Sequence, residues 1–228
     1  MPFTAPPPPQ LTTDRLSHRR GTAVSTTAQP DPAAPTAAVR RYWTQRVDGS
    51  GSWRIDHASR TAMRAPGEDL AALRAGLGRP AGTVPELWRF YTSPIDGRIT
   101  PELDAEHAAL SLYGLHQQSQ SRPMHHPGIS MGTALRTLRH SQRFSEEAVD
   151  RRVAATVHTT SVSALVYRLR GLITQLRSVE QPVDYDQLLL DIQRWKSPGP
   201  RQQVRRGWGL AYHAWSARPG NGASPEAP

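Results

Sequence analysis

The chain has 228 residues, enough for one or two domains, and carries a formal net charge of +9. It contains no cysteine, which excludes disulfides and thiolate metal sites. It also has no apolar run long enough to cross a bilayer, which excludes a helical membrane span.

Both ends of the chain are poor in large apolar residues. Residues 1–36 include a polyproline run at 6–9, and residues 216–228 are rich in Pro, Gly and Ser. Such segments bury too little apolar surface to offset the entropy of ordering, so we expect two disordered tails. Arg19-Arg20 is followed by no apolar stretch of a secretion signal, and we expect a cytoplasmic protein.

Helical spacing dominates residues 37–120. It predicts helices over 37–47, 52–65 and 68–77. Thr83 and Glu86 have capping-box spacing, with Pro85 in the first turn, and predict a short helix that holds Leu87, Trp88 and Tyr91. Thr100, followed by a proline, begins a long helix that reaches about residue 118.

A loop over 121–128 with two prolines separates this half from residues 121–215. Further helices are predicted over 130–140, from Ser145, over 161–179, from Asp184 to Trp195, and over 201–215. The helix over 161–179 carries a continuous apolar stripe that begins at Val162. No segment alternates as a strand does. We therefore predict an all-α fold of two small helical subdomains, residues 37–120 and 121–215.

The positive charge belongs to the second of these segments. Residues 37–120 carry ten Arg against nine acids, a net of +1, whereas residues 121–215 carry fourteen Arg or Lys against seven acids, a net of +7. A folded segment with this imbalance repels itself unless a polyanion lies nearby. Nucleic acid and a membrane surface are the two candidate polyanions.

The residues that could support catalysis are sparse. Nucleophile elbows, phosphate-binding loops and zinc-protease helices are absent from the sequence. The adjacent pair His125-His126 favours a loop over a metal site, because neighbouring residues rarely converge on one ion. Asp184 and Asp186 are better explained as a helix cap and a first-turn charge. We expect no enzymatic activity, no cofactor and no metal.

The arginines of the helix over 161–179 can be placed by their phase. Arg170 and Arg177 are seven residues apart, which is two helical turns, so both should project from the face opposite the apolar stripe. For any one arginine, an ordinary solvated face is an alternative. Trp195, Trp208, Tyr212 and Trp215 could stack on bases, but core packing is the more economical interpretation.

Several motifs of the second half occur in a specific order and spacing. They are Gly128 to Leu135, the Phe144 to Glu147 helix start with Arg151-Arg152, Leu169 to Leu172, and Asp184 to Leu189 leading to Trp195. Together these motifs resemble the CasB family, the small subunit of type I-E CRISPR Cascade complexes. The Leu115 to Gln120 segment resembles the branch of that family found in high-GC bacteria. The resemblance covers roughly residues 37–215.

The resemblance implies two helical subdomains, no catalytic residues, and two copies assembled with the other Cascade subunits. It implies contacts with guide RNA and target DNA, above all with the DNA strand displaced when the R-loop opens. The nucleic-acid-binding residues that it suggests are Arg74, Arg79, Arg122, Arg143, Arg152, Arg168, Arg170 and Lys196. The alternative is a stand-alone helix-turn-helix regulator of DNA, for which residues 142–152 are a poor match to a recognition helix.

Overall fold

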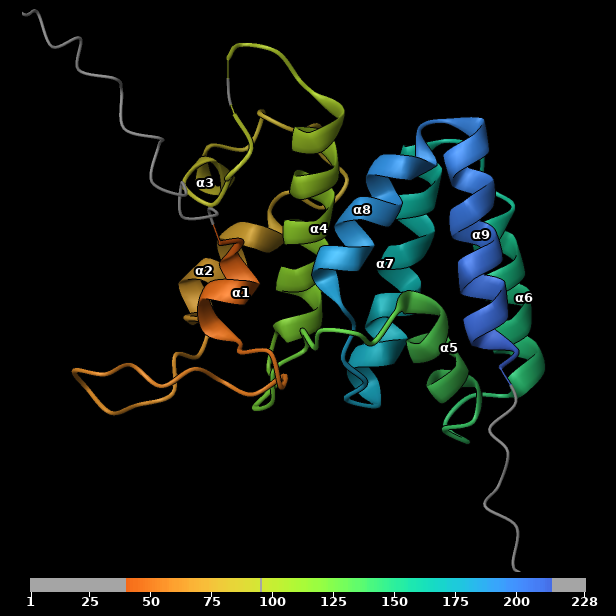
Figure 1. The fold of residues 1–228 in the computed structure, drawn as a ribbon, viewed down its shortest axis with the longest axis horizontal. Coiled ribbons are helices and arrows are strands. Elements are labelled where there is room, and N and C mark those ends of the chain that lie inside the picture. The colour runs from red at the N-terminus through yellow and green to blue at the C-terminus, as the bar shows by residue number, and fades with distance from the viewer. Residues whose placement is uncertain (1–39, 95, 215–228) are drawn as a thin grey trace, which may run out of the picture. The chain divides into compact units, whose positions relative to one another are not determined.

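The computed structural model describes residues 40–94 and 96–214, and within them it confirms the all-α prediction (Figure 1). Three isolated β-bridges are the only extended pairings among these residues. The expected tails lie outside the described residues. The helices of the described residues are α1 (Tyr42–Arg46), α2 (Gly67–Arg74), α3 (Pro85–Trp88), α4 (Pro101–Gln117), α5 (Met131–Arg139), α6 (Glu146–Val157), α7 (Val162–Ser178), α8 (Tyr185–Trp195) and α9 (Pro198–Tyr212).

Most of the long helices begin where the sequence places a capping side chain. The hydroxyls of Thr100, Ser130, Ser145 and Ser161 each accept a hydrogen bond from the backbone N–H three residues later. The Asp184 carboxylate accepts from the N–H groups of residues 186 and 187. Each cap satisfies donors that the first turn leaves free, so these starts are fixed locally.

The predicted helix over 52–65 is wrong. This segment is extended, with bridges between Val47 and Trp53 and between Ile55 and Ala62. The Asp48 carboxylate accepts from the N–H groups of residues 50 and 52, at 2.9 and 3.0 Å. Asp56 does the same for residues 58 and 59. Such local side-chain bonds compete with helical bonding and hold turns instead.

The helix bounds differ from the sequence expectations at several further places. Of the helix expected over 37–47, the described residues form a helix only from Tyr42 to Arg46. The capping box at Thr83 is wrong, because its hydroxyl donates to the Pro80 carbonyl and Val84 precedes α3 without a side-chain cap. Helix α3 also ends at Trp88, so Tyr91 lies outside it. The helix expected over 68–77 ends at Arg74. The last helix begins at Pro198, which fits the first turn of a helix because its missing N–H is not needed there.

Helix α4 contributes to the core along most of its length, packing against α2, α7 and α8. One cluster of buried apolar residues runs from Trp43 through Tyr113 to Leu169 and Trp195. The Trp43 indole also donates to the Asp186 carboxylate at 2.8 Å. This cluster contains residues from both sides of residue 121. The predicted boundary between two subdomains near residue 121 therefore remains a prediction.

None of the described helices is both long enough and apolar enough to cross a membrane.

Candidate nucleic-acid interface

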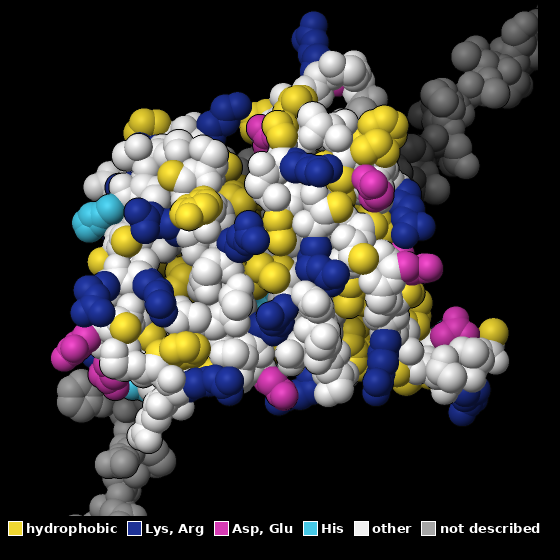
Figure 2. Space-filling view, turned by 180° about the vertical axis from the view of Figure 1, so that it is seen from behind, with side chains coloured by type: hydrophobic (Ala, Val, Ile, Leu, Met, Phe, Trp, Pro, Cys, Tyr) yellow, Lys and Arg dark blue, Asp and Glu magenta, His cyan; other side chains and the backbone are white. Residues whose placement is uncertain are grey.

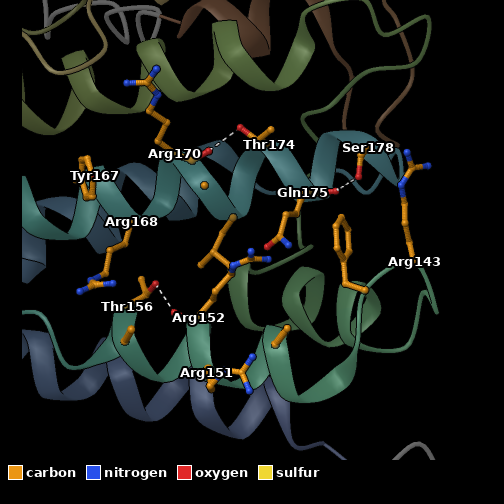
Figure 3. A pocket seen from close by; sticks show the side chains of 15 residues that line it. Arg143, Arg151, Arg152, Thr156, Tyr167, Arg168, Arg170, Thr174, Gln175 and Ser178 are labelled. Carbon is orange, nitrogen blue, oxygen red and sulfur yellow. Dashed lines mark hydrogen bonds between the residues drawn. The ribbon is translucent and has the colours of Figure 1, made fainter.

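Five exposed arginines line one hollow between α6 and α7, with a volume of about 1040 Å³ (Figure 3). One comes from the loop before α6, two from α6 and two from α7. We call this hollow the arginine basin, and its arginines are Arg143, Arg151, Arg152, Arg168 and Arg170.

The two helices hold the arginines outward because their apolar residues face the core. In α7 the stripe that includes Leu165, Leu169 and Leu172 is buried, so the intervening positions 168 and 170 lie at the surface. The lining between the arginines includes Phe144 and Gln175. Figure 3 shows Arg168 directed towards α6, whereas Arg170 is directed towards α4.

No carboxylate is among the fifteen residues that line the arginine basin. Within the described part of the chain, none of its five guanidinium groups has a salt bridge or a hydrogen bond. Unpaired guanidinium groups repel one another, and that repulsion is relieved when an anion bridges them. The hollow is therefore a concave surface suited to a polyanion.

Two of the three acids of α6 are engaged elsewhere. Arg139 bridges Glu146 at 2.8 Å and Asp150 at 3.0 Å. The Tyr212 hydroxyl donates to Asp150, and this bond together with Arg139 holds the pKa of the Asp150 carboxyl below its usual range. Asp150 thus stays ionised and paired with Arg139, and neither it nor Glu146 lines the arginine basin.

Other basic residues of this segment brace the fold. Arg177 donates to the Leu115 carbonyl and to Gln118, both at 3.2 Å. Arg201 and Arg205 donate to the carbonyls of residues 160 and 159.

Because Arg177 contacts Leu115 in α4 and Arg170 is directed towards α4, the two arginines share the side of α7 that is next to α4, as their spacing predicts. Arg177, however, is half-buried and outside the basin, so it is not opposite the buried stripe.

The structure brings four of the eight sequence-predicted residues together, namely residues 143, 152, 168 and 170. Arg79 lines a second hollow, which it shares with Arg170. Arg74, Arg122 and Lys196 line neither hollow; they lie in the last turn of α2, in the loop over 121–128 and at the end of α8.

Two residues that line the arginine basin are not among the eight nucleic-acid-binding residues suggested by the sequence. Arg151 stands next to Arg152 and lines the same hollow. Tyr167 is 77% exposed although it lies in the most apolar helix of the second half. The sequence feature that could have identified Tyr167 is its helical position, between Val166 and Arg168 and outside the buried stripe, where an aromatic ring is not needed for core packing.

The remaining candidates have structural roles. The imidazole of His125 is buried, and its Nδ1 accepts from the Tyr185 N–H at 3.1 Å. Trp195, Trp208 and Tyr212 are buried in the core, as expected, and Trp215 lies outside the described residues. In the described ranges 40–94 and 96–214, no group of three His, Asp or Glu residues converges as metal ligands would.

Figure 2 shows the side of the molecule opposite to the viewer of Figure 1. Lys and Arg side chains are spread over the whole of this face, and the few acidic side chains lie mainly near its edges. The excess of positive charge is thus a property of an extended surface as well as of the arginine basin.

Comparisons of the sequence and of the structure with known proteins agree on one family. The family model of "CRISPR-associated protein Cse2" matches residues 69–213. The crystal structure of CasB from Thermobifida fusca is 32% identical in sequence, with a TM-score of 0.53, over 65% of this chain and 85% of that one. No curated protein matches the chain.

Two other solved structures share the fold at lower identity. CasB from M. ruber is 23% identical with a TM-score of 0.50, over 65% of this chain and 85% of that one. A chain of a CRISPR RNA-guided surveillance complex is 22% identical with a TM-score of 0.50, over 65% of this chain and 82% of that one. The family model spans more than half of the sequence, from α2 through α9, and the chain therefore belongs to the CRISPR-associated Cse2 family, the family of the CasB small subunits.

Proposed function

We propose that this chain is a non-catalytic small subunit of a type I-E Cascade complex, and that its arginine basin holds a sugar-phosphate backbone. The observation that carries the proposal is the gathering of five arginines around one hollow, without a carboxylate in its lining and without a side-chain partner among the described residues. Arginine pairs bidentately with phosphate, and binding is driven chiefly by the release of counterions from the strand.

The backbone in question is that of the guide RNA and target DNA, above all the displaced strand of the R-loop. Backbone contacts fix a strand in place without reading its bases, as a guide-directed complex requires of its accessory surfaces. Exchange of a DNA duplex for an RNA–DNA heteroduplex is nearly balanced in free energy. A surface that holds the displaced strand therefore shifts this balance towards the open R-loop.

The other Cascade subunits are the proposed partners, with two copies of this chain in the complex. Family membership supports this, and a chain of an RNA-guided surveillance complex has the same fold. Co-purification with the remaining subunits and a guide RNA should recover the chain at low salt. Protection of a single operator sequence by the isolated chain would instead support the DNA-regulator alternative.

The test of the site is a triple variant, Arg152→Ala with Arg168→Ala and Arg170→Ala. We expect it to assemble normally and to lower R-loop stability on a matched target by about tenfold or more, since several charge-assisted contacts are lost. The measurement is the dissociation rate of the complex from target DNA.

The control removes the same charge from exposed arginines outside the basin that have no side-chain partner among the described residues, namely Arg60, Arg64 and Arg98. It should leave the dissociation rate within about twofold of wild type, because distant exposed charges are largely screened at physiological salt. Equal rates for the basin variant and wild type would remove the arginine basin from the function.

A further inference from the structure

A second hollow, of about 400 Å³, adjoins the arginine basin. It lies between α4, α7 and the loop over 76–81 that follows α2. Tyr167 and Arg170 line both hollows, so the two are continuous around these side chains. We call it the Tyr167 hollow, and its apolar lining is Leu77, Pro80, Ala81, Ala108, Val162 and Val166.

Tyr167 is the most exposed of the large hydrophobic side chains in the described residues, at 77%. Figure 3 shows its ring on the same side of α7 as Arg170, the side directed towards α4. Its hydroxyl and ring have no partner among the described side chains. A free aromatic face next to an apolar recess is suited to a flat ligand with a π-system, since such ligands stack on aromatic rings.

The polar groups of the hollow divide into engaged and free ones. His107 Nδ1 lies 2.7 Å from the Tyr91 hydroxyl, and its Nε2 lies 3.0 Å from the Gly76 carbonyl. Ser111 donates to the His107 carbonyl at 2.8 Å. These walls are therefore satisfied internally, and burial lowers the pKa of His107, which favours the neutral ring.

The free groups are at the exposed positions of the lining. The guanidinium groups of Arg79 and Arg170 have no partner in the described residues and would attract a phosphate. The exposed carboxylate of Asp104 can accept from an exocyclic amine. An apolar recess with an aromatic face, two cations and one acceptor is complementary to a nucleotide, with its base inside and its phosphate outside.

We propose that the Tyr167 hollow accepts one unstacked base of the displaced DNA strand whose phosphates lie on the arginine basin. This inference rests on the proposed function of the basin. A duplex keeps its bases paired in its interior and offers none to the hollow. The pair of hollows thus selects single-stranded DNA over duplex DNA, whereas the arginines alone bind either.

The test uses the full chain and two single-stranded DNA oligonucleotides of equal length, one normal and one with abasic sites throughout. Fluorescence anisotropy at low salt gives the dissociation constants. Tyr167→Ala should weaken binding of the normal strand by about tenfold, the lower-to-middle range for loss of one aromatic–base stack. It should leave binding of the abasic strand unchanged, and Tyr167→Phe, which keeps the ring, should bind both strands as wild type does.

Arg152→Ala separates this inference from the function on which it rests. It should weaken both strands by the same factor, because both carry the same phosphates. Tyr167→Ala could instead weaken binding of both strands equally or of neither, while Arg152→Ala still weakens binding of both. In that case no base enters the hollow, and only the proposed function of the arginine basin is supported. If Arg152→Ala also has no effect, the proposed function fails as well.

Discussion

At the scale of single residues, His116 shows how the core sets the response of the fold to pH. Its imidazole is fully buried, with Nδ1 3.0 Å from the Tyr185 hydroxyl. Burial lowers the pKa of His116 to about 3, and the nearby Arg177 acts in the same direction. Burial also lowers the pKa of His107 and of His125. The folded protein thus holds neutral histidines that the unfolded chain would protonate below about pH 6.5.

The sign of the consequence follows from proton linkage. Between about pH 6.5 and 3 the unfolded chain binds a proton at residue 116 that the folded chain does not, so stability falls as the pH falls. One such group lowers the free energy of unfolding by up to about 1.4 kcal/mol for each unit by which the pH falls. His116→Asn should therefore make the free energy of unfolding depend less steeply on pH between 6.5 and 5.

Urea denaturation at several pH values measures this slope. The control is His57→Asn, at an exposed loop position, and it should keep the wild-type slope. A His116→Asn slope parallel to that of wild type would show that the ring is protonated in the folded state.

At the scale of elements, the distance between helices is set by small residues. A Cβ built on Gly132 in α5 would lie 2.4 Å from the Trp208 carbonyl oxygen and 2.9 Å from the Ala211 Cβ, both in α9. The two helices therefore approach through a glycine. Gly171, in the middle of α7, has nothing within 4 Å of the same position.

The two glycines are matched for a stability test. Gly132→Ala should destabilise the fold by about 1–3 kcal/mol, because α5 and α9 must separate. Gly171→Ala should stabilise it by up to about 1 kcal/mol, because alanine is the better helix former. Thermal unfolding measures both. A Gly132→Ala change that leaves the stability unchanged or raises it would contradict the close approach of α5 and α9.

Element starts were the most predictable feature of this fold, because a capping side chain acts on N–H groups within three residues of itself. Thr100, Ser130, Ser145, Ser161 and Asp184 all show this. The segment over 52–65 was not predictable as a helix or a turn from apolar spacing. Its conformation depends on carboxylate bonds of Asp48 and Asp56 and on pairing between its own ends.

The site was predictable only in part, for a related reason. The net charge of residues 121–215 located the basic surface, and four of the predicted arginines lie together in the basin. Phase along one helix could not show that Arg177 meets the end of α4, 62 residues away in sequence at Leu115. It also could not show that Tyr167 lies beside the loop over 76–81.

At the scale of the whole molecule, a continuous core fixes the positions of the helices that carry the basin. Trp43 in α1, Tyr113 in α4 and Leu169 in α7 belong to the same buried cluster. Packed interiors resist small displacements. The arginines of α6 and α7 are therefore presented on a rigid support, and a bound strand gains its contacts without ordering the protein.

The central claim is that the arginine basin holds a sugar-phosphate backbone. The salt dependence of binding to single-stranded DNA tests this claim most directly. For a single strand, the slope of log affinity against log salt concentration is about −0.7 for each phosphate neutralised. The triple variant of residues 152, 168 and 170 should flatten that slope by about 2 if each arginine meets one phosphate. The control variant of residues 60, 64 and 98 should keep the wild-type slope. Equal slopes for wild type and the basin variant would contradict the claim that this hollow holds the backbone.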